Sequence, residues 1–157
     1  MYTYYLSLGS NIGDRIAYLQ QAIVCLQDRV GDLVQQSSYY YSQPWGYQSD
    51  NEYINIAIKI HSSLTPEQLL ITTQAIEREL GRVVKGIYSD RTIDIDILLA
   101  FDVSCQSIVV HSDILTIPHS KMFERPFVMV PLQQIYDEPI ELSSIEERIA
   151  KMQFFNS

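Results

Sequence analysis

Residues 53–61 read Tyr-Ile-Asn-Ile-Ala-Ile-Lys-Ile-His, and this stretch decides the fold. The isoleucines occupy every second position, and polar or small residues alternate with them. Side chains of a strand point alternately to the two faces of its sheet, so the pattern predicts a strand with one face in the core. Tyr53 and Asn55 are then expected to share the opposite face.

The residues that follow this strand predict a helix. Residues 65–68, Thr-Pro-Glu-Gln, combine a capping Thr, Pro at the first helical position and Gln three residues after the cap. Gly81 is expected to end the helix. Gln74 and Glu77 lie three residues apart and are expected to form a polar stripe beside the apolar one.

Working outward, the same reasoning assigns the other elements. Helices are predicted over 14–30, behind Asn11 or Asp14 as cap and closed by a left-handed Gly31, and over 127–136. Ser143 with Glu146 predicts the capping box of a short C-terminal helix. Strands are predicted over the ranges 2–8, 33–42, 91–101 and, shorter, 106–110.

The predicted order βαββαβ is the ferredoxin-like α+β arrangement, with additional C-terminal elements. It places both helices on one face of an antiparallel sheet and leaves the other face for a ligand. Residues 82–90 fit neither period and are interpreted as a loop. The 157 residues are expected to form a single domain, 1–157.

The composition excludes several classes of protein. With 46% hydrophobic and 19% charged residues, the chain is not of the disordered class. Its formal net charge of -8 lacks the basic surface of a general nucleic-acid binder. No apolar stretch approaches the ~18 residues that span a bilayer, so no membrane partner is expected. Cys25 and Cys105 are interpreted as reduced core residues, which favours a cytoplasmic protein.

A pair of carboxylates is the clearest chemical signal. In residues 91–97, Arg-Thr-Ile-Asp-Ile-Asp-Ile, the isoleucines are expected to enter the core while Asp94 and Asp96 project together from the other face. Like charges this close favour a bound cation, and Mg²⁺ prefers carboxylate and phosphate oxygens. The alternative is a solvated polar face on an edge strand. The flanking isoleucines favour a central strand and the metal site.

Cations and aromatic residues complete the candidate site. Arg82, Lys85 and Arg91 could bind phosphate, or they could be solubilising loop charges. No P-loop or kinase glycine-rich loop is present. Tyr53, Trp45 and Phe127 could stack a flat heterocycle whose edge Asn55 binds, and the alternative for each aromatic residue is core packing. The possible aromatic stack and the carboxylates predict a small-molecule site.

Five motifs together carry a family resemblance. They are Ser7-Leu8-Gly9-Ser10-Asn11, Tyr53-Ile54-Asn55, Glu77 with Gly81-Arg82, residues 91–97, and Pro118-His119 followed by Glu124-Arg125 and residues 127–132. In these motifs the chain resembles the 6-hydroxymethyl-7,8-dihydropterin pyrophosphokinase family of folate biosynthesis. The resemblance implies transfer of pyrophosphate from ATP to the pterin hydroxymethyl oxygen, with AMP released. It also implies a monomer whose partners are these two substrates.

The same resemblance implies roles for individual residues. Asp94 and Asp96 are expected to hold two Mg²⁺ ions, and Arg82 and Arg91 to bind phosphate and assist the transfer. Contacts to ATP are expected from Gln74, Glu77, His119 and Arg125. The pterin is expected to stack between Tyr53 and Phe127, and its edge to meet Asn55 and the backbone around Ser42, Pro44 and Trp45.

Two competing classes share the predicted fold. An RNA-binding module of this kind carries stacked aromatic residues in a basic string on its sheet, where this chain has Asp94 and Asp96. A regulatory module that binds a small molecule needs neither paired carboxylates nor Arg82 and Arg91 near them. The release of AMP from ATP in the presence of a pterin separates the enzyme from both.

Overall fold

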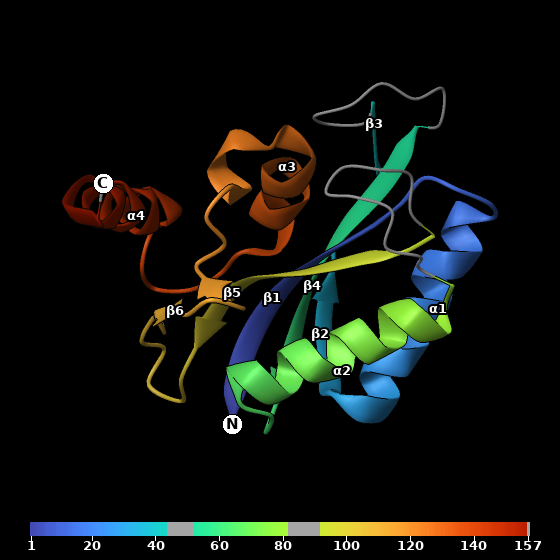
Figure 1. The fold of residues 1–157 in the computed structure, drawn as a ribbon, viewed down its shortest axis with the longest axis horizontal. Coiled ribbons are helices and arrows are strands. Elements are labelled where there is room, and N and C mark those ends of the chain that lie inside the picture. Colours follow the sequence, from blue (N-terminus) through green and yellow to red (C-terminus); the bar gives the residue numbers. More distant parts are fainter. Residues whose placement is uncertain (44–51, 82–91, 157) are drawn as a thin grey trace.

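The strands form an antiparallel sheet with helices on both of its faces (Figure 1). The computed structural model describes residues 1–43, 52–81 and 92–156. In chain order the strands of the sheet are β1 (Tyr2–Ser10), β2 (Gly31–Gln36), β3 (Tyr40–Ser42), β4 (Tyr53–Ser62) and β5 (Asp94–Phe101). Their order across the sheet is β2-β4-β1-β5, and β3 pairs with β4. The predicted ferredoxin-like α+β fold is confirmed.

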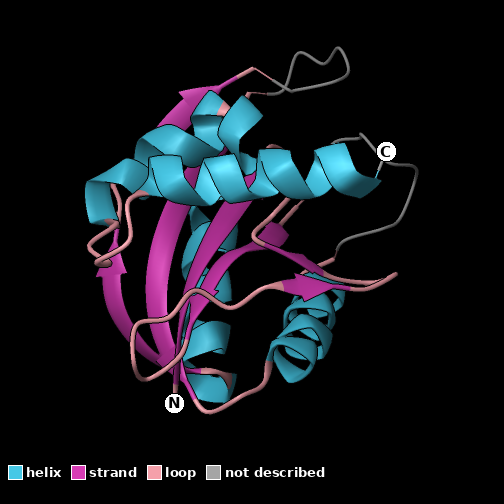
Figure 2. Cartoon of the chain, turned by 90° about the vertical axis from the view of Figure 1, so that its left-hand side faces the viewer, coloured by secondary structure: helices cyan, strands magenta, loops and turns pink. Residues whose placement is uncertain are grey.

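The helices divide between the two faces. α1 (Arg15–Arg29) and α2 (Pro66–Glu79) lie on one face, and α3 (Pro126–Ile135) lies on the other (Figure 1). α4 (Leu142–Asn156) runs across the strands and leads to the C-terminus (Figure 2). The sequence predicted that the face opposite α1 and α2 is left for a ligand. This prediction is wrong for the part of that face that apolar side chains of α3 and α4 cover.

Each face of the sheet carries an apolar core. Between the sheet and the helices α1 and α2, all four isoleucines of β4 are buried, which confirms the face predicted for them. The prediction of a half-buried strand is wrong, because Asn55, Ala57 and Lys59 on the other face of β4 are buried as well. On the other face, Tyr5 and Phe101 pack beneath α3 and against Ile145 of α4. The rings of Tyr5 and Phe101 meet edge to face, with centroids 6.0 Å apart. The open part of this second face is thus the part beyond the aromatic core.

The place of β5 in the sheet differs from the prediction. The isoleucines beside Asp94 and Asp96 predicted a central strand, but β5 lies at the edge, next to β1. The outer edge of β5 is covered by the chain that follows it, because Ile108 N donates to the carbonyl of Ala100 at 2.8 Å and His119 N to that of Leu98 at 2.9 Å. An edge strand covered in this way has the apolar pattern of a central one.

The start of α1 was predicted correctly from the sequence, and the reason predicted for its end was not. Asp14 caps the helix, because its side chain accepts a hydrogen bond from Ala17 N at 3.1 Å. The left-handed closure at Gly31 is wrong, since Val30 ends the helix and Gly31 begins β2. A Cβ atom at Gly31 would lie 1.8 Å from the His61 carbonyl oxygen. Glycine is needed here because β2 approaches β4 closely.

The other helix ends also test the predictions. The capping box of Thr65 and Gln68 is present in full, and Gly81 has a φ of 93° after α2. The predicted capping box at Ser143 is wrong, because the backbone N–H groups of Ser144 and Ile145 donate to the carbonyl of Glu141 and the helix begins at Leu142, two residues earlier than a cap at Ser143 requires. The resulting helix has 15 residues.

The remaining segments complete the outline. The strand predicted over 33–42 is divided into β2 and β3, and that over 106–110 is reduced to β6 (Val110–His111), which pairs with β7 (Thr116–Ile117). The 3-10 helix η1 (Met122–Glu124) precedes α3. The core placement of Cys105 is wrong: it is exposed in the turn after β5, whereas Cys25 packs against the first core.

Within the described residues, no helix has both the length and the apolar character needed to cross a membrane. The loop predicted over 82–90 lies outside the residues that the structure describes.

Candidate active site

Three strands present one row of residues on the open half of the second face. Gly9 of β1 pairs with Asn55 of β4 on one side and with Asp94 of β5 on the other. Residues paired across antiparallel strands place their side chains on the same face. Since neighbouring strands lie about 4.8 Å apart, the backbones of Asn55 and Asp94 are roughly 10 Å apart, with a glycine between them. Glycine at the centre of the row leaves room over β1 for a side chain from a neighbouring strand.

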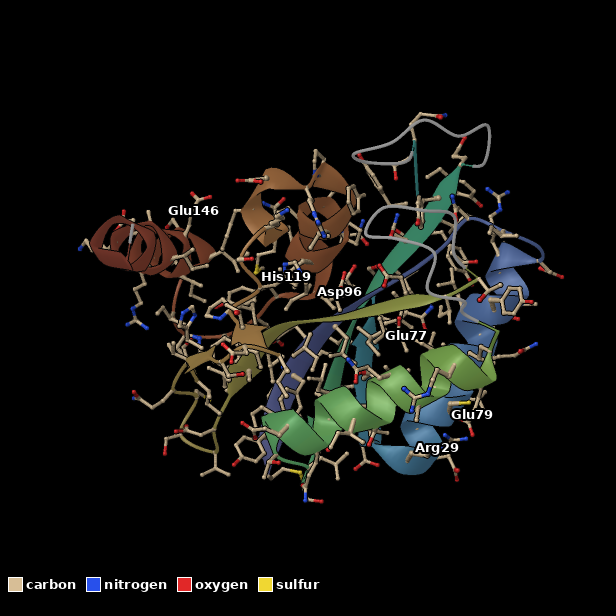
Figure 3. All side chains as sticks on the ribbon, viewed as in Figure 1. Arg29, Glu77, Glu79, Asp96, His119 and Glu146 are labelled. Carbon is tan, nitrogen blue, oxygen red and sulfur yellow. The ribbon has the colours of Figure 1, made fainter. Side chains whose placement is uncertain are left out.

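The next row inward repeats this arrangement. Ser7 of β1 pairs with Ala57 of β4 and with Asp96 of β5, so a small side chain again lies between β4 and β5. Figure 3 shows Asp96 on the side of β5 that faces α3. Asp94 and Asp96 stand about 7 Å apart at Cα, on the face that the alternating pattern predicted. Both carboxylates therefore border the same floor of small residues.

The side chain of Asn55 lies directly over Gly9. A Cβ atom at Gly9 would be 2.5 Å from Asn55 Oδ1 and 3.5 Å from Cδ1 of Tyr53. Asn55 is 4% exposed, and its Nδ2 donates to Ser42 Oγ at 3.5 Å. The structure thus brings Ser42, Tyr53 and Asn55 together at one side of the floor. Glycine at position 9 is required for this close approach.

The opposite side of the floor is formed by the chain between β7 and α3. The backbone N–H of His119 donates to the Leu98 carbonyl, which places His119 beside β5. In Figure 3 His119 and Asp96 lie near each other on the α3 side of the strand. The guanidinium carbon of Arg125 lies 5.8 Å from the centre of the Phe127 ring. His119 therefore lies near both Arg125 and Asp94, and Phe127 lies against Arg125 and the second apolar core.

The surroundings of His119 determine its protonation. Burial lowers the pKa of His119 to about 4; the charges of Arg125 and Lys121 also lower it, and that of Asp94 opposes them. The imidazole is consequently neutral at pH 7. Its Nδ1 accepts a hydrogen bond from Lys121 N at 3.2 Å, so the proton resides on Nε2. His119 can therefore donate a hydrogen bond to an anionic ligand without carrying a charge.

The donor set fits a cation that also binds a ligand. In the described parts of the chain, no three His, Cys, Asp or Glu side chains gather closely enough to hold a metal ion by themselves. Asp94 and Asp96 form a pair of carboxylates, and Mg²⁺ commonly takes one or two carboxylates and completes its six oxygen ligands with phosphate and water. The site fits Mg²⁺ that arrives with a nucleotide better than a closed structural metal site.

Two of the predicted nucleotide contacts lie on α2. Gln74 is exposed, whereas Glu77 is 3% exposed, so the expected polar stripe is wrong for Glu77. Figure 3 shows Glu77 between α2 and β5, and Asp96 on the other side of that strand. Glu77 is therefore buried on the side of the sheet that α2 covers, whereas Asp96 lies on the side of β5 that faces α3.

Four predicted site residues lie outside the described part of the chain: Pro44, Trp45, Arg82 and Arg91. The residue before β4 is held from α1, since Arg15 Nη1 donates to the Glu52 carbonyl at 2.7 Å. This contact anchors the chain immediately before Tyr53.

Reasoning from the residues alone missed three members of the site. Ser7 and Gly9 form its floor, and Lys121 fixes the tautomer of His119 through its backbone N–H. A signal for the first two exists in the sequence, because small residues at positions 7 and 9 alternate with leucines at 6 and 8. No local signal marks Lys121.

Comparisons with known proteins agree in pointing to one family. The model of the family described as 7,8-dihydro-6-hydroxymethylpterin-pyrophosphokinase matches residues 5–137. A relative from Porphyromonas gingivalis named 2-amino-4-hydroxy-6-hydroxymethyldihydropteridine pyrophosphokinase is 46% identical over 136 residues, which cover 83% of this chain and 88% of the relative. A Bacillus subtilis protein of the same name is 42% identical over 132 residues, covering 83% of this chain and 76% of that protein.

The solved structures agree with the fold. A Plasmodium falciparum HPPK-DHPS crystal structure matches with a TM-score of 0.66 and 14% sequence identity. The match covers 90% of this chain and 42% of the longer Plasmodium chain. At this identity the likeness supports the ferredoxin-like architecture alone.

Proposed function

This chain belongs to the 7,8-dihydro-6-hydroxymethylpterin-pyrophosphokinase family, and from that membership we infer its activity. It transfers pyrophosphate from ATP to 6-hydroxymethyl-7,8-dihydropterin in folate biosynthesis, giving AMP and the dihydropterin pyrophosphate. The observation that carries this conclusion is the family match over residues 5–137, which includes Asn55, Asp94 and Asp96 on one face of the sheet.

We propose that Asp94 and Asp96 hold two Mg²⁺ ions together with the phosphate oxygens of ATP. Bound Mg²⁺ supplies positive charge that neutralises these oxygens and helps to align them. The support is the paired carboxylates on the open face of β5 and the donor set described above. In the reaction the hydroxymethyl oxygen forms a bond to the β-phosphorus, and the bond from that phosphorus to the AMP oxygen breaks. The hydroxyl proton leaves to solvent.

The proposed contacts to ATP are Gln74, Glu77, His119 and Arg125, of which the two on α2, Gln74 and Glu77, rest on the family resemblance alone. His119 is suited to a phosphate oxygen because its Nε2–H is a neutral donor next to Asp94. The guanidinium of Arg125 provides parallel donors beside it. Arg82 and Arg91 are proposed to assist transfer by meeting the negative charge that grows on the departing AMP, a role that rests on the resemblance of their motifs.

The pterin is proposed to lie over the floor of Ser7 and Gly9. Its ring stacks between Tyr53 and Phe127, and its edge meets Asn55 and the backbone around Ser42, Pro44 and Trp45. The roughly 10 Å between Asn55 and Asp94 supports this placement, because a bicyclic ring whose edge lies at Asn55 directs its hydroxymethyl group toward the carboxylates. The buried Asn55 amide supplies both a donor and an acceptor.

We further propose that residues 1–157 act as one domain and as a monomer in the cytoplasm, with no nucleic-acid or membrane partner. The family match across residues 5–137 supports a single functional unit. Two free cysteines and ATP as co-substrate support a reducing compartment.

The direct test of the function is product analysis. Purified protein with ATP and Mg²⁺ is expected to form AMP only when 6-hydroxymethyl-7,8-dihydropterin is added, in a one-to-one ratio to the pterin pyrophosphate. Chromatography of the nucleotides and pterins measures both products. Formation of ADP, or of AMP at a rate that does not depend on the pterin, would contradict the proposed transfer.

The close contact between Gly9 and Asn55 yields a specific prediction. Gly9→Ala is expected to displace the Asn55 amide and to weaken pterin binding by about tenfold, the equivalent of one or two lost hydrogen bonds, while the affinity for an ATP analogue stays unchanged. Isothermal titration with 6-hydroxymethylpterin and with the analogue measures both affinities.

The control for this prediction is the Asn55→Ala background. If the added methyl group acts through Asn55, Gly9→Ala causes no further loss of pterin affinity there. Equal losses in both backgrounds would show that the methyl group disturbs the site by another route.

A further inference from the structure

A glutamine on α3 holds the connection between β2 and β3. Oε1 of Gln134 accepts hydrogen bonds from both the backbone N and the Oγ of Ser38, each at 2.9 Å. A carbonyl oxygen has two lone pairs, so one atom of α3 satisfies two donors of the same residue. Ser38 is thereby fixed in both its backbone and its side chain.

The residue before this contact is anchored on the other side. Ser37 N donates to the Ala57 carbonyl at 2.9 Å, and Ser37 Oγ accepts from Ala57 N at 2.9 Å. The chain at residues 37 and 38 is therefore held between β4 and α3, after β2 ends and before β3 begins. The position of β3 depends on these anchors.

Strand β3 is one wall of the proposed pterin site. Its last residue, Ser42, accepts the hydrogen bond from Asn55 Nδ2, and Tyr40 pairs with Asn55 along the strands. A shift of β3 would therefore alter the setting of the Asn55 amide. The contact at Ser38 is separated from β3 by a single residue.

The opposite wall is on the same helix as Gln134. Phe127 precedes Gln134 by seven positions, close to two full turns of a helix, so both side chains project from the same side of α3. α3 packs against β3 and β4. One face of α3 thus carries the aromatic ring and also holds the strand that lies across from it.

We propose that Gln134 is a positioning residue for the pterin site, which sets the separation between Phe127 and the Asn55–Ser42 pair by holding Ser38. The inference rests on the proposed function, because it assumes that the pterin binds between these walls. When the contact is lost, fewer molecules have the correct separation, and the apparent pterin affinity falls by that fraction. None of the proposed nucleotide contacts lies on β3 or touches Ser38, so the affinity for ATP should not depend on this contact.

The test compares three variants of two adjacent glutamines. Gln134→Ala is expected to weaken 6-hydroxymethylpterin binding about three- to tenfold, measured by titration with Mg²⁺ and a saturating non-hydrolysable ATP analogue. The affinity for the analogue is expected to stay unchanged, and the KM for the pterin to rise while kcat does not fall. Gln134→Glu should restore wild-type affinity, because a carboxylate oxygen accepts both bonds. Gln133→Ala, exposed on the same helix, is the matched control and should match the wild type.

Asn55→Ala and Phe127→Ala separate the two levels of the proposal. If both weaken pterin binding and Gln134→Ala does not, the positioning role is wrong and the proposed pterin site stands. If neither weakens it, the site itself is wrong, and the inference falls with it. If Gln134→Ala weakens the binding of the pterin and of the ATP analogue equally, the variant has a general structural defect and the inference is overturned. The same holds if Gln134→Glu does not bind the pterin with wild-type affinity.

Discussion

Asp94→Asn and Asp96→Asn are each expected to reduce pyrophosphoryl transfer at saturating ATP and pterin by on the order of a thousandfold. Both carboxylates lie on the open face of β5 and border the floor at Gly9 and Ser7. Charge stabilisation of a phosphate by a bound metal ion is worth several kcal/mol, and about 1.4 kcal/mol corresponds to a factor of ten in rate. The amide retains the shape of the side chain and removes the charge that the cation needs.

The fold of these variants is expected to be retained, because neither aspartate belongs to the two apolar cores. Thermal melts and single-turnover AMP formation over a range of Mg²⁺ concentrations are the measurements. Asp113→Asn, exposed in the turn between β6 and β7, is the matched control and should keep wild-type activity. Near-normal transfer by either active-site variant at modest Mg²⁺ would refute the metal assignment.

Lys59→Met is expected to lower the free energy of unfolding by about 3–5 kcal/mol, the usual cost of removing one partner of a buried ion pair. The Lys59 side chain is 11% exposed, and its Nζ lies 2.6 Å from Asp137 Oδ1 and 3.3 Å from Glu138 Oε2. The hydroxyl of Tyr5 lies 2.9 Å from the first of these oxygens and 2.7 Å from the second, and it can donate its single proton to either of them. Without the ammonium group, the 6% exposed side chain of Glu138 is left as a buried carboxylate beside a second one.

Urea denaturation followed by circular dichroism measures this loss. Lys151→Met, which removes an exposed lysine on α4, should leave stability unchanged. The double variant Lys59→Met/Glu138→Gln should recover part of the loss, because the buried carboxylate is then neutral. A Lys59→Met protein as stable as the wild type would show that the ion pair contributes nothing beyond the packing of the lysine stem.

The same cluster determines a pH dependence of stability. Burial by itself would lower the pKa of Lys59, but the hydrogen bond and charge of Asp137 and the charge of Glu138 outweigh it, and the pKa is raised; the hydrogen bond from Lys59 lowers the pKa of Asp137. The lysine contribution is therefore present below its ordinary pKa of 10.5 and lost as the pH rises further. The aspartate contribution is present above 3.8 and lost as the pH falls. In urea denaturation at several pH values, Lys59→Met should lack the lysine contribution and the part of the aspartate contribution that comes from Lys59, and keep the part that comes from the hydrogen bond of Tyr5 to Asp137.

Local sequence patterns were sufficient to predict several strands and helix ends of this protein. The alternation over residues 53–61 predicted the strand and its two faces, and residues 65–68 predicted a helix start that is present in full. A similar alternation over residues 93–97 predicted that Asp94 and Asp96 lie on one face of their strand, without knowledge of the neighbouring strand. Each of these features depends on the geometry of a single strand or helical turn, so residues a few positions apart determine it.

Some site residues could not be placed from local patterns. Glu77 lies three residues from Gln74, but it is buried, because the packing of α2 on the sheet decides which side of the helix is covered. The sequence around Gly9 indicates only the end of a strand. The need for glycine there follows from Asn55 of β4, whose side chain lies over Gly9 in the folded protein. For the active site, the sequence supplied the chemistry of the side chains, and the packing of α2 and β4 decided their neighbours.

The sequence by itself determined the order of the long helices and strands and which side chains of a strand share a face. Only the tertiary structure decided that β5 lies at the sheet edge, that Gly31 serves the approach of β2 to β4 rather than the end of α1, and that α3 and α4 cover half of the ligand face. These outcomes depend on contacts between segments far apart in the chain. A local pattern shows which side chains share a face, but it does not show which distant segment covers that face.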